Sequence, residues 1–155
     1  MALQKGDKAP NFTLFNSDKQ AVSLSDLAGK NVIIHFFPAA FTGVCTEQLC
    51  NMRDNINYYT NLNATVLGIS VDSPFTLGKF KAEQNYNFDL LSDFNKNTIK
   101  DFGVYRENFV FGMNGVANRA AFVIDKEGVV QHAEVLDNPG NLPDFSAIKS
   151  TLEGL

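Results

Sequence analysis

Two near-continuous apolar runs stand out when hydrophobic and polar positions are followed along the chain, at residues 31–37 and 64–71. Each has the length of a strand, and such a run is typical of a strand that is covered on both faces of a sheet. Between the runs, apolar side chains recur at spacings of three and four residues, which predicts a helix with one apolar face. These side chains are Leu49, Met52, Ile56 and Tyr59. Strand, helix and strand in this order predict a parallel βαβ unit.

The segments around this unit extend the α/β pattern. Strands are predicted near 12–14, at 88–91, and at 119–124 with a hairpin return over 129–136; a helical turn is predicted over 23–29, and helices over 75–84 and 144–152. Together they predict an α/β sandwich with a mixed central sheet flanked by helices. The loop after residues 31–37 then lies at the carboxyl edge of the sheet, where such folds place their sites.

Length and charge narrow the class of protein. A chain of 155 residues with 45% hydrophobic content is about the size of one domain, and without repeats or linkers we expect a single domain over residues 1–155. The net charge of -4 and the pI near 5.1 provide no basic stripe, which speaks against nucleic acid as a partner.

The N-terminus and the cysteines bear on the cellular setting. The first residues contain no apolar signal core, and the longest apolar stretch, 32–41, is interrupted by His35 and Pro38, so we expect neither secretion nor membrane spanning. Two cysteines separated by five positions do not form the disulfide framework of a small secreted domain. A reducing, cytoplasmic setting fits best.

Cys45 is the strongest candidate for a reactive residue in this sequence. It follows a strand, a proline-bearing loop and a glycine, which places it in the first turn of the predicted helix, where unpaired N–H groups favour the nucleophilic thiolate. Thr42 could donate its hydroxyl to the thiolate or to a substrate oxygen, and Pro38 could shield the site and fix the loop. The residues also allow a plainer interpretation, in which Cys45 is a small buried hydrophobe and Thr42 caps the helix.

The pattern at 36–45, Phe-Phe-Pro-Ala-Ala-Phe-Thr-Gly-Val-Cys, resembles the active-site segment of peroxiredoxins, which reads Pro-x-x-x-Thr/Ser-x-x-Cys after an apolar strand. Similar landmarks occur from residues 6–12 to the hairpin, so the resemblance covers nearly the whole chain. It implies a thioredoxin-like fold and a thiol-dependent peroxidase in which Cys45 attacks a hydroperoxide and becomes a sulfenic acid. Thr42 and Arg119 would bind the peroxide oxygens, whereas without the resemblance Arg119 is better explained as an exposed strand-end residue.

Cys50 is open to two interpretations. An intact helix separates it from Cys45 by about 140° and roughly 7.5 Å, so a disulfide requires the first helical turns to unwind. Residues 45–50 resemble the Cys-Thr-x-Gln-x-Cys of the bacterioferritin comigratory protein branch, in which the second cysteine resolves the sulfenic acid. Residues 40–44 are closer to the alkyl hydroperoxide reductase E-like branch, whose members are often one-cysteine enzymes. Cys50 is therefore either a resolving cysteine or a packed, inert one.

The resemblance also implies partners. Electrons would come from thioredoxin or a glutaredoxin-like protein, and the family often forms homodimers. The apolar segment 109–115 is expected to be a loop under the active site or a dimer contact. His35 and His132 lie in predicted strands without other metal-ligand residues at suitable spacing, so we expect no metal and no cofactor, and histidines that are satisfied or partly exposed.

A different class of function must be weighed against the peroxidase. The same fold could serve a thioredoxin-like thiol–disulfide oxidoreductase or a non-catalytic redox-binding module. The first should carry Cys-x-x-Cys, which this sequence does not contain. The second gives no reason for Pro38, Thr42, Cys45 and Arg119 to occur together.

Overall fold

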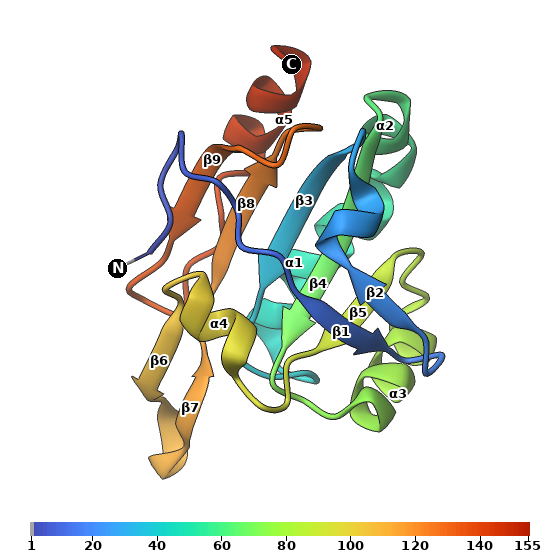
Figure 1. The fold of residues 1–155 in the computed structure, drawn as a ribbon. Helices are drawn as coiled ribbons and strands as arrows, with labels where there is room; N and C mark the ends of the chain where they lie inside the picture. Colours follow the sequence, from blue (N-terminus) through green and yellow to red (C-terminus); the bar gives the residue numbers. More distant parts are fainter. Residues whose placement is uncertain (1) are drawn as a thin grey trace.

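The core of the fold is a mixed sheet. The computed structural model describes residues 2–155. The strands of this sheet are β1 (Thr13–Asn16), β2 (Ala21–Ser23), β3 (Asn31–Phe36), β4 (Ala64–Ser70), β5 (Asp89–Ser92), β8 (Ala120–Ile124) and β9 (Val130–Val135). Within the described residues they form a seven-stranded sheet in the order β2-β1-β5-β4-β3-β8-β9 (Figure 1). β3, β4 and β5 are parallel to one another, and the remaining neighbours are antiparallel, as the predicted α/β sandwich requires.

The predicted βαβ unit is present, but its helical part is divided. β3 and β4 pair in parallel, with all six residues of β3 buried. Between them the chain forms α1 (Gly43–Asp54) and α2 (Ile56–Asn61), with non-helical backbone at Asn55. The Asn55 side-chain amide donates to the Asn51 carbonyl, the acceptor that the Asn55 backbone N–H would use in an uninterrupted helix, and that N–H bonds to Met52 instead. The apolar periodicity therefore predicted the buried face correctly and missed the break.

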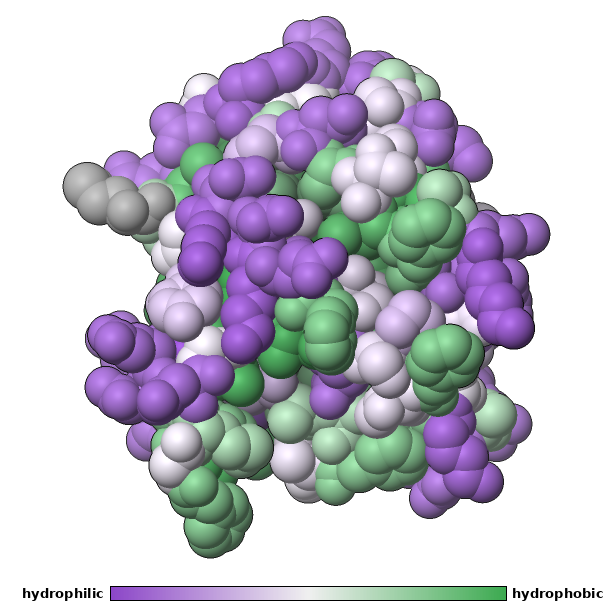
Figure 2. All heavy atoms as spheres, turned by 60° about the horizontal axis from the view of Figure 1, so that its bottom comes forward, coloured by the Kyte–Doolittle hydropathy of each residue, from purple (hydrophilic) through white to green (hydrophobic). Residues whose placement is uncertain are grey.

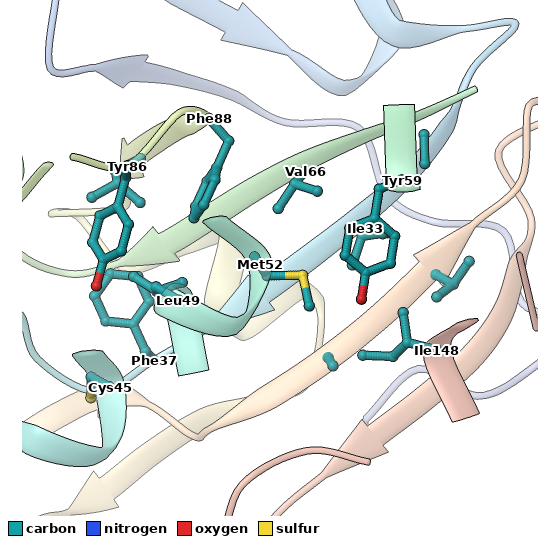
Figure 3. Packing of buried hydrophobic residues seen from close by; sticks show 14 of the residues in the cluster. Ile33, Phe37, Cys45, Leu49, Met52, Tyr59, Val66, Tyr86, Phe88 and Ile148 are labelled. Carbon is teal, nitrogen blue, oxygen red and sulfur yellow. The ribbon is translucent and has the colours of Figure 1, made fainter. Parts of the chain in front are cut away.

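Helices cover the two faces of the sheet unequally. On one face, α1 and α2 pack with α3 (Pro74–Gln84) and α5 (Phe145–Glu153) in a single apolar cluster. Figure 3 shows Leu49 of α1 next to Phe37 and Met52 between Val66 and Ile148, with Cys45 at one end of this cluster. The opposite face is covered by α4 (Asn97–Asp101) and the N-terminal segment. Among residues 2–155, no helix combines the length and apolar character needed to cross a bilayer.

The chain between α4 and β8 differs from the expected loop. It folds into a second, two-stranded sheet of β6 (Tyr105–Asn108) and β7 (Asn114–Ala117), joined by a 3-10 turn, η2 (Val110–Gly112). Phe111 in this turn adopts a left-handed backbone with φ of 58° and is 97% exposed. The sequence contains no strong alternation of apolar and polar residues here, so the hairpin was not predicted. The predicted hairpin of β8 and β9 and the closing helix α5 are confirmed.

Candidate active site

The site lies where β3 ends and α1 begins. Cys45 is in the first turn of α1, as predicted, and its side chain is fully buried at 0% exposure. Pro38, at the bend that follows β3, is also buried. The sulfur therefore lies at the carboxyl edge of the sheet, with the N-terminal end of α1 around it and the proline loop beside it.

Asp72, after β4, anchors the loop that precedes Cys45. Its Oδ2 accepts hydrogen bonds from the Ala40 backbone N–H at 2.8 Å and from the Ser70 hydroxyl at 2.6 Å. Phe41, the residue after Ala40, has a left-handed φ of 66°. The centre of its ring lies 5.1 Å from the centre of the Phe80 ring in α3. The neighbouring strand and α3 thus fix a strained loop in place. Asp72 was not among the site residues predicted from the sequence, because its contact with the loop depends on β4 lying beside β3.

Arg119 directs its guanidinium at the sulfur. Both terminal nitrogens, Nη1 and Nη2, lie 3.3 Å from Cys45 Sγ, and Nε donates to the Pro139 carbonyl at 3.0 Å. The residue immediately precedes β8 and is 3% exposed, so the interpretation as an exposed strand-end residue is wrong. A guanidinium keeps its charge and offers several fixed donors, so this placement stabilises a thiolate and any negative charge that develops beside it.

Gln48 holds the guanidinium from the other side. Its Oε1 accepts a hydrogen bond from Arg119 Nη1 at 2.9 Å, and its Nε2 lies 2.8 Å from Nδ1 of His35. The Gln48 side chain is fully buried. The sequence interpretation used Gln48 to compare branches of the family. Its position three residues after Cys45 on one helix was the available signal, because residues three apart share a helix face.

Thr42 lies at the N-cap of α1, and its hydroxyl has a backbone partner. It donates to the Ala39 carbonyl at 2.9 Å, while the Thr42 carbonyl accepts from the Thr46 hydroxyl at 2.8 Å. In this arrangement the Thr42 side chain stabilises the turn before α1 instead of donating to Cys45. The exposed position of Thr42 leaves its hydroxyl reachable by a ligand that enters beside the loop.

Cys50 lies on the same unbroken helix as Cys45, about one and a half turns further on. Its half-buried sulfur lies 3.8 Å from the Tyr86 hydroxyl and 3.9 Å from Gln84 Oε1. The Tyr86 hydroxyl also donates to the Thr46 carbonyl at 3.2 Å, so it bridges two turns of α1. Burial, and secondarily the contact with Cys50, raises the pKa of Tyr86, which keeps the phenol protonated. The two cysteines therefore cannot meet while α1 keeps this form.

The two histidines differ in their surroundings. His35 is fully buried, and desolvation, with a smaller contribution from nearby His132, lowers its pKa to about 3. Within the described part of the chain its Nε2 has no hydrogen-bond partner, so the expectation of a satisfied or partly exposed histidine is wrong for His35. His132 retains some exposure and lies 3.7 Å from Glu134. Across residues 2–155, no group of three or more His, Cys, Asp or Glu side chains could hold a metal ion.

Comparisons with known proteins agree with this geometry. The sequence profile of the AhpC/TSA family matches residues 5–133. Peroxiredoxin Bcp of Escherichia coli strain K12 is 39% identical over 132 residues, covering 84% of each chain. Alkyl hydroperoxide reductase E of Mycobacterium bovis is 37% identical over 145 residues, covering 92% of this chain and 91% of its own.

A solved structure extends the agreement to the fold. The crystal structure of peroxidoxin BcpB from Mycobacterium tuberculosis superposes with a TM-score of 0.87 at 27% identity, covering 99% of this chain and 98% of that one. This likeness confirms the predicted thioredoxin-like fold. The family match spans most of the chain, and the named relatives are aligned over more than four fifths of it. The chain therefore belongs to the AhpC/TSA family and is a thiol peroxidase of the peroxiredoxin type.

Proposed function

We propose that Cys45 is the peroxidatic cysteine of this enzyme and that Arg119 and Thr42 are its partners in binding the peroxide. The observation that carries the proposal is the pair of 3.3 Å contacts from both Arg119 terminal nitrogens to the buried Cys45 sulfur. A thiolate so placed is neutralised by a charge that never titrates away, and the same donors can follow negative charge onto the departing oxygen. Pro38 contributes a wall without an N–H donor of its own.

The proposed chemical step is a two-electron transfer from the Cys45 sulfur to the peroxide. The Cys45 thiolate attacks the terminal oxygen of ROOH, the S–O bond forms as the O–O bond breaks, and RO⁻ leaves and is protonated to water or an alcohol. Cys45 is then a sulfenic acid, oxidised by two electrons, and the peroxide is reduced by two. The Thr42 hydroxyl can turn from the Ala39 carbonyl and donate to a peroxide bound at Cys45, because Thr42 and Cys45 both lie at the start of α1.

Cys50 is proposed to resolve the sulfenic acid. Its thiol would attack Cys45–SOH, expel water and form a disulfide once the first turns of α1 unwind. A dithiol partner, thioredoxin or a glutaredoxin-like protein, would then reduce this disulfide and become oxidised itself. A reducing, cytoplasmic location is proposed with it, because such partners are kept reduced there.

A homodimer is proposed from the character of the surface around the site. Figure 2, viewed from the edge of the sheet at which β3, β4 and β5 end, displays several apolar groups on this face. Large exposed hydrophobics follow each of these three strands, Phe41 after β3, Phe75 at the start of α3 and Phe94 after β5, and Phe111 lies in η2 between β6 and β7. Apolar side chains exposed in such number are typical of an interaction surface. The concentration dependence of sedimentation for reduced protein tests it, and a monomer at all concentrations would reject it.

Single-turnover consumption of hydrogen peroxide by reduced protein tests the catalytic proposal. Wild type and Cys50→Ser should both consume one equivalent quickly, and Cys45→Ser, which keeps the Cys50 thiol, should react no faster than a free thiol in solution. Mass spectra should then show a disulfide in wild type and a sulfenic acid in Cys50→Ser. Equal rates in wild type and Cys45→Ser would reject Cys45 as the nucleophile. Reduction of insulin disulfides without peroxide consumption would favour a thiol–disulfide oxidoreductase instead.

A further inference from the structure

His35 is a buried polar residue that the chemical steps above do not use. It is the fifth residue of β3, and all six residues of this strand are buried. Its ring is 0% exposed and lies 6.2 Å from the ring of Phe145 in α5. Its Nε2 carries no hydrogen bond within residues 2–155, which costs free energy that an apolar side chain of similar size would avoid. Packing therefore does not account for a histidine at this position.

The Nδ1 atom of His35 has a defined partner. It lies 2.8 Å from Gln48 Nε2, which is the shortest contact of that amide nitrogen; the carbonyls of Phe36 and Ala120 lie at 3.4 and 3.5 Å. The opposite end of the same amide faces Arg119, which has donors and no acceptor. The oxygen of Gln48 must therefore point to Arg119 and its NH₂ group to His35, and Nδ1 must be the unprotonated acceptor nitrogen.

We propose that His35 is a positioning residue for the peroxidase reaction, which this chain performs through the proposed roles of Cys45 and Arg119. By accepting from Gln48 Nε2, His35 holds the amide with its oxygen towards Arg119. A reversed amide would place an NH₂ group against the guanidinium, where two donors repel. The chain of contacts from His35 through Gln48 and Arg119 to Cys45 Sγ then keeps both terminal nitrogens of the arginine on the sulfur.

The neutral form of His35 is what this role requires. The titratable and charged groups linked to His35 are His132 on β9, which lies 3.7 Å from Glu134, and Arg119, reached through Gln48. A proton on Nδ1 would turn the acceptor into a donor and break the bond to Gln48. Burial lowers the pKa of His35 to about 3, so the acceptor persists throughout the neutral range.

Two substitutions of nearly equal shape separate this role from packing. Leucine and asparagine both lack the outer ring atoms and place an atom close to the position of Nδ1, but asparagine offers an acceptor oxygen there and leucine does not. In single-turnover peroxide consumption, His35→Leu should react about five-fold more slowly than His35→Asn, the loss expected for one hydrogen bond. Equal rates in the two variants would overturn the proposal.

A Gln48→Met background shows whether the effect passes through Gln48. Because the acceptor at position 35 then has no amide to orient, the difference between the leucine and asparagine variants should vanish. Persistence of the five-fold difference there would overturn the proposal. If wild type itself reacts no faster than Cys45→Ser, the proposed function fails rather than the role of His35.

The tautomer of His35 can be measured in wild type without any substitution, and one variant then tests the hydrogen-bond partner of Nδ1. Nitrogen-15 spectra of reduced wild type should show an imidazole with unprotonated Nδ1 and protonated Nε2 at pH 7. The Gln48→Met variant should shift the Nδ1 resonance, because its hydrogen bond is lost. A protonated Nδ1, or a resonance unaffected by Gln48→Met, would overturn the proposal.

Discussion

The buried imidazole of His35 should make the stability of this protein fall as the pH falls through the range in which an ordinary histidine titrates. Its pKa is about 3 in the folded state against 6.5 for an unperturbed histidine, because burial penalises the charged ring. The unfolded chain therefore binds a proton at His35 near pH 6.5, whereas the folded chain does not. The stability that depends on neutral His35 is fully present above the unfolded-state pKa of 6.5. It is lost as the pH decreases below that pKa, because the unfolded state then binds more protons than the folded state.

The size of the effect follows from the two pKa values. With one proton bound by the unfolded chain, the free energy of unfolding should decrease by about 1.4 kcal/mol between pH 8 and pH 5.5, and by about 2 kcal/mol at pH 5. Over this interval the result depends little on the folded value, because the folded ring stays neutral throughout. Burial raises the pKa of Asp93, so protonation of this carboxyl increases stability as the pH falls, opposite to the effect of His35. A matched comparison of variants is therefore needed to isolate the histidine.

Urea unfolding of reduced protein at pH 8, 7, 6 and 5, followed by far-ultraviolet circular dichroism, measures the effect. His35→Leu should lose about 2 kcal/mol less stability than wild type between pH 8 and pH 5, because the group responsible has been removed. His132→Leu, which removes the other histidine of the chain, should keep the His35 contribution. The reasoning fails if His35→Leu and wild type lose the same stability over this interval.

Three further predictions concern the sulfur atoms and the core. Arg119→Lys loses the fixed fork of donors at Cys45 and should slow single-turnover peroxide reduction by about 100-fold; a rate within two-fold of wild type would contradict it. Tyr86→Phe removes the hydroxyl that lies beside Cys50 and bonds to the Thr46 carbonyl in the first turns of α1. Formation of the Cys45–Cys50 disulfide after peroxide treatment, timed by mass spectrometry, should therefore become about five-fold faster. An unchanged or slower rate would count against the unwinding step. Met52→Ala empties a fully buried position and should lower the free energy of unfolding in urea by about 2–5 kcal/mol, whereas a loss below 1 kcal/mol would show that the core closes over the cavity.

The sequence predicted the parts of the fold that rest on local periodicity. Apolar runs with no polar alternation correctly placed β3 and β4 in the interior of the sheet, because a strand covered on both faces has no polar side to expose. Asn55 broke the predicted helix through a single side-chain hydrogen bond, which periodicity does not register. The β6–β7 hairpin was missed because its strands are short and its turn contains Phe111 in a backbone conformation that rarely suits phenylalanine.

The sequence correctly placed Cys45 at the start of a helix but could not show contacts between distant segments. Cys45, Thr42 and Pro38 lie within eight positions of one another, so their proximity follows from the chain itself. Arg119 reaches the sulfur from 74 positions away, and without a family resemblance its sequence context favoured an exposed position. The role of Asp72 depends on β4 lying beside β3, and the role of His35 depends on how α1 packs over β3, and both are properties of the assembled fold.

In the proposed mechanism, oxidation of Cys45 would change the contacts that hold the first turn of α1, and this would resolve a conflict between the two steps. Attack on the peroxide requires Cys45 to be fixed beside Arg119, whereas disulfide formation with Cys50 requires the same turn to unwind. A thiolate attracts the guanidinium as an anion, but the sulfenic acid that replaces it is neutral and makes weaker hydrogen bonds. Oxidation would therefore weaken the contact between Arg119 and Cys45 just before α1 must unwind. Gln48 and Pro139 would still hold the Arg119 side chain in position for the next cycle.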